Sequence, residues 1–231
     1  MEKIKNRIVF FFIIFFFIIY PVNSHISHYK ILKKIEMEIL KDGKVIGYNF
    51  YFFNKEEGVI IVKNQIHFKI DLFGVEVFNF EGYGMEKYKD GKLISYESKT
   101  KQNNKEKFVN LVYEPENDKF NIKGSSYTGF AGTNNMIGNW WNHQILQADS
   151  QISPVSGSIK KQVVTFLAKE KIQLYGKIIE VDHFKLASKD TNIPKDRRLD
   201  FDIWYDSKNA MIVKVSYSRM GNWEYRLKNY E

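Results

Sequence analysis

The residues LDFDIWYDSKNAMIVKVSYSRMGNWEYRLK, numbered 199–228, alternate between apolar and polar side chains in three successive runs. Within these runs the odd positions are apolar or aromatic, and the even positions are polar except at Trp204 and Ile212. Successive side chains of a strand point to opposite faces of its sheet. The pattern therefore predicts a three-stranded antiparallel meander with one dry face and one mostly wet face.

The turn after the first run sets an expected register for this meander. Residues 207–209 can form a three-residue loop in which Asn209 takes the left-handed conformation that asparagine tolerates. The pairs that this loop predicts are Tyr205 with Met211, Asp202 with Lys214, and Trp204 with Ile212. This register places opposite charges across from each other and keeps the apolar side chains of both strands on one face.

The first 24 residues differ from the rest of the chain. Three basic residues precede an unbroken apolar run at positions 8–20, and a Val-Asn-Ser ending follows at 22–24. We therefore expect residues 1–24 to be a secretory signal peptide that is cut before His25, leaving residues 25–231 as a single antiparallel β domain in the periplasm. The alternative is an uncleaved membrane anchor, although the run is shorter than the ~18 to 20 apolar residues of a spanning helix.

Composition narrows the class of protein. The 231 residues include no cysteine, which excludes disulfides, thiolate zinc sites, cysteine nucleophiles and lipid attachment at a cysteine. The formal net charge is +8, but the basic residues are scattered among acidic ones rather than gathered in a block. We expect no nucleic-acid partner, at most a weak attraction to anionic envelope surfaces, and membrane contact only through an uncleaved leader.

Hairpin signals recur along the remaining chain. Asp42-Gly43 and Glu57-Gly58 separate alternating runs, and a break is expected near residues 71–74 because residues 59–80 are too long for one flat strand. A second Lys-Asp-Gly-Lys at 89–92 resembles the stretch that begins at Lys41, so either a duplicated unit or shared hairpin chemistry is indicated. Further strands are predicted at 108–113, 119–123, 162–168, 171–175 and 178–187.

The middle of the chain has a different character. Residues 124–138 are rich in glycine, serine and threonine and are expected to form a long mobile loop. Asn139 can cap a short helix from Trp140 to about Ala148, the one helix expected in the mature chain. The fold class that follows is mainly β: a single large curved antiparallel sheet of about 10–12 strands, a half-barrel or open barrel, with the short helix as its plug or lid.

Few residues suggest catalysis or metal binding. The five histidines show no metal-ligand spacing apart from His25 and His28, so we expect no metal and no cofactor. The serines of 124–129 lack the spacing of a nucleophile elbow. Asp182 and His183 are adjacent and point to opposite faces of a strand, which indicates a structural histidine.

One pair of carboxylates could support acid/base chemistry. Asp200 and Asp202 share a face, about 7 Å apart by strand rise. Lys214, expected opposite Asp202, offers the simpler interpretation of a solvated ion pair.

An aromatic cluster is the most specific feature of the chain. Large apolar side chains gather around the glycine-rich segment, where one tryptophan could fill the dry face and the other cover its edge. They could equally form the mouth of a lipid-binding half-barrel. The candidate ligand-binding residues are Trp140, Trp141, Phe130, Tyr127, His143 and Trp204.

Two motifs carry a resemblance. At residues 89–100 (KDGKLISYESKT) and 203–206 (IWYD) the chain resembles a family of exported bacterial proteins known only as a domain of unknown function. More distantly, the arrangement is similar to the LolA and LolB type of periplasmic lipoprotein carrier. That resemblance implies an apolar ligand held between a curved sheet and a helical lid.

Three functions are consistent with these observations. The first is a non-enzymatic exported protein that binds an apolar or lipid-like ligand in the concavity of its sheet. The second is a structural or assembly protein whose strand edges or Trp204 face bind an envelope protein. The third is an enzyme that uses the carboxylate pair.

Overall fold

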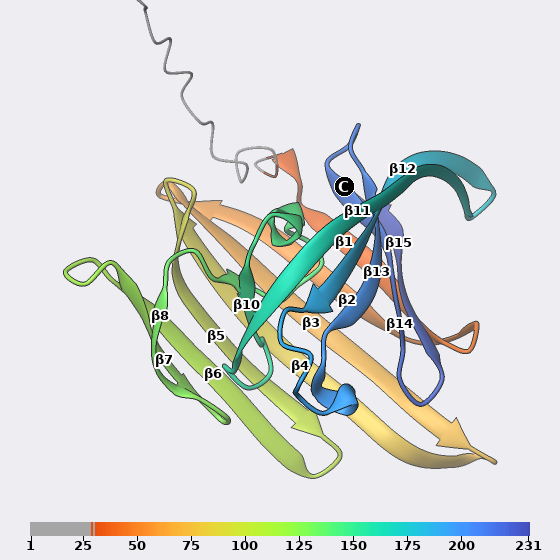
Figure 1. Ribbon diagram of the computed structural model, residues 1–231, viewed down its shortest axis with the longest axis horizontal. Helices are drawn as coiled ribbons and strands as arrows, with labels where there is room; N and C mark the ends of the chain where they lie inside the picture. Colours follow the sequence, from red (N-terminus) through yellow and green to blue (C-terminus); the bar gives the residue numbers. More distant parts are fainter. Residues whose placement is uncertain (1–28, 30) are drawn as a thin grey trace, which may run out of the picture.

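The computed structural model describes Tyr29 and residues 31–231, so the predicted leader at 1–24 lies outside the described residues. A 15-stranded sheet accounts for most of this part of the chain, in the order β8-β7-β6-β5-β4-β3-β2-β1-β15-β14-β13-β12-β11-β10-β9 (Figure 1). Neighbouring strands are antiparallel, except β9 and β10, which are parallel. The strands are β1 (Lys34–Lys41), β2 (Lys44–Glu56), β3 (Val59–Leu72), β4 (Val75–Lys89), β5 (Lys92–Gln102), β6 (Lys105–Glu114), β7 (Lys119–Gly124), β8 (Thr128–Gly132), β9 (Met136–Ile137), β10 (Ser150–Ile152), β11 (Ile159–Leu174), β12 (Lys177–Ser188), β13 (Asp200–Asp206), β14 (Met211–Ser218) and β15 (Asn222–Tyr230).

The predicted curved antiparallel sheet is confirmed, with more strands than the 10–12 expected. Its curvature follows from one contact. In a flat sheet β3 and β15 would lie about 14 Å apart, because β2 and β1 separate them. The rings of Phe68 on β3 and Trp223 on β15 nevertheless lie 5.5 Å apart, so the two wings of the sheet bend toward each other.

The two-residue turns form as their sequences predict. Asp42-Gly43, Glu57-Gly58 and Asp90-Gly91 all have φ near +48° to +49° followed by φ near +80°. This is the geometry of a type I′ hairpin turn, which glycine adopts without strain. The expected break near residues 71–74 is also confirmed, as the Phe73-Gly74 turn between β3 and β4.

The predicted helix from Trp140 to Ala148 is wrong. The segment holds only the 3-10 helix η2 (His143–Leu146), whose cap is Asn142 rather than Asn139. The amide of Gly138 donates to the carbonyl of Ile152, and the side chain of Asn139 is used in a buried hydrogen bond described below. These contacts fix residues 138 and 139, and the chain bends at Trp140 and Trp141, where an α-helix would have to begin.

The glycine-rich stretch at 124–138 is not one long loop, because it contains β8 and β9. Likewise, the strands predicted at 162–168 and 171–175 are one strand, β11, with a register shift between Phe166 and Ala168. Local composition favoured loops in both places, whereas pairing with neighbouring strands decides the outcome. A second 3-10 helix, η3 (Lys195–Arg197), lies in the loop before β13.

The register expected for the closing meander is also wrong. Asp206 pairs with Met211, Tyr205 with Ile212 and Trp204 with Lys214, and it is Ala210 rather than Asn209 that has a positive φ, of +52°. Two features cause the difference: the turn spans four residues, 207–210, rather than three, and a bulge between Trp204 and Tyr205 adds a second one-residue shift. With this pairing the side chain of Ile212 lies in the same buried cluster as Ile203, which explains why the even position 212 is apolar.

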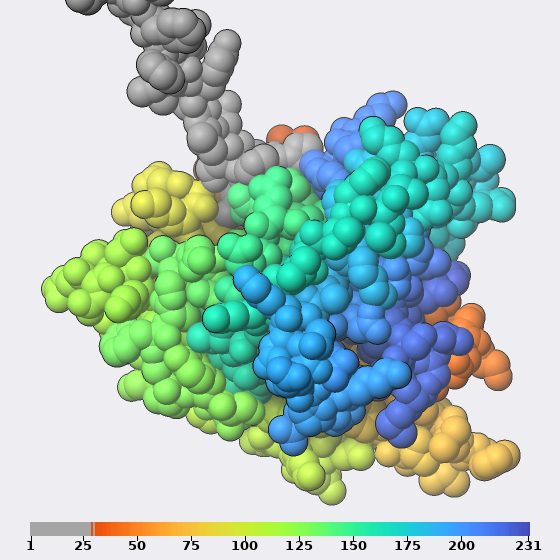
Figure 2. All heavy atoms as spheres, in the orientation of Figure 1, coloured from red at the N-terminus to blue at the C-terminus, as the bar shows by residue number. Residues whose placement is uncertain are grey.

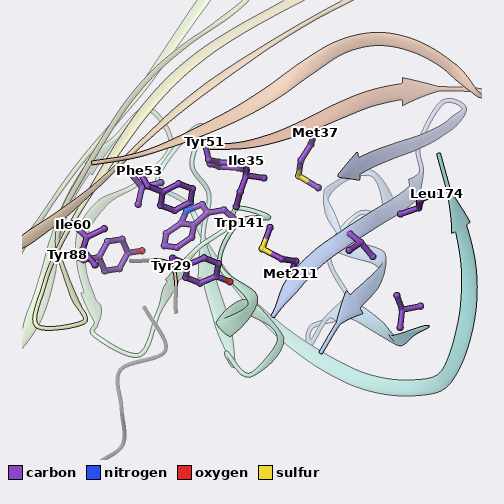
Figure 3. Close-up of a cluster of buried hydrophobic side chains, with 13 residues drawn as sticks. Tyr29, Ile35, Met37, Tyr51, Phe53, Ile60, Tyr88, Trp141, Leu174 and Met211 are labelled. Atoms are coloured by element: carbon purple, nitrogen blue, oxygen red, sulfur yellow. The ribbon is translucent and has the colours of Figure 1, made fainter. Parts of the chain in front are cut away.

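The core is packed around Trp141. Its indole is 1% exposed and makes edge-to-face contacts with the rings of Tyr29, Phe53 and Tyr88 at 5.1 to 5.8 Å (Figure 3). Tyr29, also buried, donates from its hydroxyl to the carbonyl of Ala210. None of the helices in the described part of the chain is long and apolar enough to cross a bilayer.

Candidate ligand-binding cavity

A cavity of about 440 Å³ lies in the concavity of the sheet. We call it the central cavity. Its walls come from β2 to β5 on one side and from β14 and β15 on the other. Residues 137–155, which we call the middle segment, close it with residues 137–140, Pro154 and Val155. This volume suits one small or chain-like ligand.

Small residues on two adjacent strands create the hollow. The row of β4 that faces the concavity runs Phe80, Gly82, Gly84, Glu86, Tyr88, so its centre carries no side chains. On β5, Ser98 lies opposite Gly84 and Thr100 opposite Gly82. A Cβ on Gly82 would come within 2.7 Å of Cγ2 of Ile66, so glycine is needed there for close packing as well.

The end of the cavity nearest the β3–β4 turn is apolar. The rings of Phe68 and Phe80 stack at 5.0 Å, and Trp223 meets Phe68 edge-on. The cavity reaches the surface beside Arg219, an exposed residue that also lines it. The apolar lining consists of Ile66, Phe68, Phe78, Phe80, Val155, Tyr217, Trp223 and Tyr225.

The opposite, inner end is polar and centres on the carboxyl group of Glu86, which is 2% exposed. Asn139 Nδ2 and Trp141 Nε1 donate to Oε1 at 2.8 and 2.9 Å, and the hydroxyl of Tyr88 donates to Oε2 at 2.5 Å. Burial raises the pKa of Glu86 to about 7, and the three donors lower it without outweighing burial. Glu86 thus holds two side chains of the middle segment and faces the cavity.

A second set of polar groups extends this end. The hydroxyl of Tyr51 accepts hydrogen bonds from Asn49 Nδ2 at 2.9 Å and from the amide of Trp140 at 3.3 Å. Asn64 Nδ2 donates to Asn49 Oδ1. Burial raises the pKa of Tyr51, so its hydroxyl stays protonated at neutral pH and is available as a donor.

The structure places the predicted site residues in different parts of the molecule. Trp140 lines the central cavity and packs edge-on against Phe201. Trp141 lies behind the cavity wall in the core, and buried His143 is hydrogen bonded through Nδ1 to the hydroxyl of Tyr29 at 2.6 Å.

The other three predicted residues do not line the central cavity. Phe130 is about half exposed on β8, and the hydroxyl of Tyr127 donates to its carbonyl. Trp204 lies on β13 beside His183, and their rings stack at 4.5 Å. Of the six candidates, therefore, only Trp140 lines the cavity directly.

The carboxylate pair belongs to an ion-pair network on the sheet. Lys185 Nζ lies 2.6 Å from Asp200 Oδ1 and 2.8 Å from Asp202 Oδ2. His183 bridges Asp202 and Glu170, with 3.0 Å from each ring nitrogen to a carboxylate oxygen. These partners lower the pKa of Asp202 although burial opposes them. Among the described residues no three His, Asp or Glu side chains are placed to hold a metal ion.

The sequence analysis missed Glu86, Gly82 and Gly84. Two signals point to them: alternate glycines inside an otherwise regular strand, and a carboxylate in the apolar row of that strand. Neither signal specifies a partner, because Asn139 and Trp141 are more than 50 residues away in sequence.

The comparisons with known proteins agree with this architecture. The chain is similar to the crystal structure of a β-barrel-like protein of domain of unknown function DUF1849 from Brucella abortus, with a TM-score of 0.59 and 10% identity over 87% of this chain and 97% of the other. At that identity the similarity concerns the fold alone. No curated protein matches the chain in sequence. Residues 37–228 match the domain of unknown function DUF6134, and the chain therefore belongs to this family of barrel-like β proteins.

Proposed function

We propose that this protein is an exported, periplasmic, non-enzymatic carrier that binds an apolar or lipid-like ligand in the central cavity. The observation that supports it best is the cavity itself, because its volume depends on the glycines of β4 and the walls of its apolar end are mainly aromatic. Proteins usually fill such space with side chains unless a ligand uses it. The leader predicted at 1–24 supports export.

The two ends of the cavity favour an amphipathic ligand. An acyl chain would lie against Phe68, Phe80 and Trp223, where burial of each methylene group contributes about 0.8 kcal/mol. A hydroxyl or amide group of the ligand would lie toward Glu86 and Tyr51, which offer hydrogen-bonding atoms. This chemistry agrees with the carrier function that the distant resemblance to LolA and LolB implies.

A cavity-filling variant tests the proposal. Val155 lines the cavity, and Val155→Trp adds volume there, whereas Val112 is exposed on β6 and Val112→Trp serves as the matched control. Palmitate binding to the delipidated proteins is measured by isothermal titration calorimetry at about pH 5.5, where Glu86, with a pKa of about 7, is protonated and does not repel the palmitate carboxylate, with circular dichroism to check folding. We expect Val155→Trp to weaken binding at least about tenfold and Val112→Trp to leave it unchanged. Equal palmitate affinity in all three proteins, or no binding by the wild type, would contradict a ligand site in the cavity.

A second candidate function is binding to an envelope protein. β8 is the last strand at one end of the sheet, and Phe130 on it is about half exposed. An edge strand can pair with a strand of another protein. Crosslinking in intact cells from position 130 would recover one partner repeatedly if this is the function, and a Phe130→Asp variant would lose it.

A further inference from the structure

The hairpin between β3 and β4 ends in exposed apolar side chains: Leu72, Phe73, Val75 and Val77. We call these four residues the apolar tip. The hairpin projects from the body at the lower right of Figures 1 and 2, where its residues are yellow-orange. Phe73 is fully exposed, and a cluster of this kind on a projecting hairpin indicates an interaction site.

The residue types at comparable turn positions suggest that the turn does not need phenylalanine at position 73 in order to form. The equivalent turn positions of three other hairpins carry Asp42, Glu57 and Asp90. Phe73 has the same left-handed backbone, with φ of +53°, which a bulky side chain adopts only at some cost. Tyr175 also occupies such a position, but its hydroxyl donates to Glu38 at 2.7 Å, a contact within the protein that Phe73 lacks.

The apolar tip continues the lining of the central cavity. Along the concave face, Phe68 pairs with Phe80, Ile70 with Phe78 and Leu72 with Val75. The first pair is buried in the cavity wall and the last is exposed at the tip. An unbroken apolar row therefore leads from the cavity to the end of the hairpin.

Basic residues gather around Arg219, which lines the cavity. Lys160 Nζ donates to the carbonyl of Arg197 at 3.1 Å, and Arg219 Nη2 donates to the carbonyl of Arg198 at 3.3 Å. None of these four side chains forms an ion pair with another described residue. We call Lys160, Arg197, Arg198 and Arg219 the basic rim.

We propose that the apolar tip and the basic rim together bind the surface of an anionic lipid bilayer, with Phe73 inserted among the lipids. Apolar insertion and attraction of basic groups to anionic headgroups are the two terms that hold proteins on membranes. A projecting hairpin suits a bilayer, which needs no matching pocket. This contact differs from the membrane association through an uncleaved leader that the sequence analysis considered. Transfer of a lipid along the apolar row rests on the proposed function, whereas the membrane contact itself does not.

The test compares two substitutions at matched turn positions, Phe73→Asn and Tyr175→Asn. Asparagine tolerates the left-handed backbone, so both variants are expected to fold. Binding is measured by co-sedimentation of the protein with vesicles of phosphatidylcholine and phosphatidylglycerol in equal parts. We expect the wild type to bind, Phe73→Asn to bind at least about tenfold more weakly, and Tyr175→Asn to bind like the wild type.

Several outcomes would overturn the proposal. No binding of the wild type to these vesicles would do so, as would equal binding by Phe73→Asn, which would leave only a general attraction of charges. A Phe73-dependent dimer in sedimentation velocity without vesicles would assign the tip to a second copy of the chain instead. Phe73→Asn should keep its calorimetric affinity for palmitate in solution, while Val155→Trp should keep its vesicle binding. The two measurements therefore test the membrane contact and the ligand site independently, and either proposal can be disproved without the other.

Discussion

Glu86 occupies a position where a strand of this sheet would ordinarily place an apolar residue. Its neighbours in the concave row are Gly84 and Tyr88, and its oxygens accept only from side chains that are themselves buried. A raised pKa in a cavity marks a group that can respond to conditions near neutral pH. The same carboxyl group therefore secures the middle segment and makes its attachment sensitive to pH.

Stability should depend on pH through Glu86. The pKa is about 7 in the folded protein and 4.5 in the unfolded chain, so the folded state binds the proton more tightly. The free energy of unfolding should fall as pH rises from about 4.5 to about 7, by up to about 3 kcal/mol, and then change no further on this account. Urea unfolding at about pH 5 and about pH 8 measures this difference, and Glu86→Gln should remove most of it. The same pH dependence in Glu86→Gln would assign the effect to other groups.

At the scale of elements, the side chains of two residues attach the middle segment to the sheet, and helix propensity contributes little to its conformation. Asn139 and Trp141 both donate to Glu86, and η2 covers only four residues. The sequence predicted a short helix here as the plug or lid of the sheet, and the structure has only the 3-10 helix η2 in its place. The helix predicted for it was wrong because a partner 55 residues away, at position 86, outweighs local propensity.

Removing one of these hydrogen bonds should loosen the segment without unfolding the sheet. At about pH 8, where Glu86 is charged, Trp141→Phe loses a hydrogen bond to a charged partner, which costs about 1.5 to 3 kcal/mol. Hydrogen exchange at residues 138–147 should then accelerate by roughly ten- to a hundredfold, with little change in β2 to β5. Trp204→Phe is the control, since Trp204 lies on β13 and does not contact Glu86. Unchanged exchange in Trp141→Phe would mean that other contacts hold the segment.

The strand predictions show which features of an element can be read from sequence. The Asp-Gly turns at 42–43 and 90–91 formed as predicted, because they depend on two adjacent residues. The register of β13 and β14 did not, because the turn takes four residues instead of three and a bulge follows Trp204, and adjacent residues alone do not specify either feature. The cavity was equally hidden, since its floor combines Gly84 on β4 with Ser98 on β5.

At the scale of the whole molecule, the two ends of the described chain meet in the middle of the sheet. β15 lies between β1 and β14, and the amide of Lys34 and the carbonyl of Glu231 are hydrogen bonded at 3.0 Å. β15 therefore joins the two wings that enclose the central cavity. The pairing of β1 with β15 joins residues that are far apart in sequence, which favours slow, non-local folding.

Deleting residues 222–231 should therefore prevent folding altogether. Each wing would keep its own hairpins but would lose the strand that joins them, together with Trp223 from the wall of the cavity. Circular dichroism and urea unfolding should show no cooperative transition in the truncated protein. A nick between Tyr175 and Gly176, at an exposed hairpin turn, should by contrast leave a cooperative transition. A folded truncation would show that the wings are independent units.

The position of Tyr29 limits where a leader could be cut from the chain. Its ring is stacked on Phe53 inside the core, yet only four residues separate it from the cut expected before His25. A peptidase that overran this site by a few positions would remove a buried aromatic side chain along with the leader. Accurate cleavage at the predicted border would thus be a condition for a stable product, and an affinity tag belongs after Glu231.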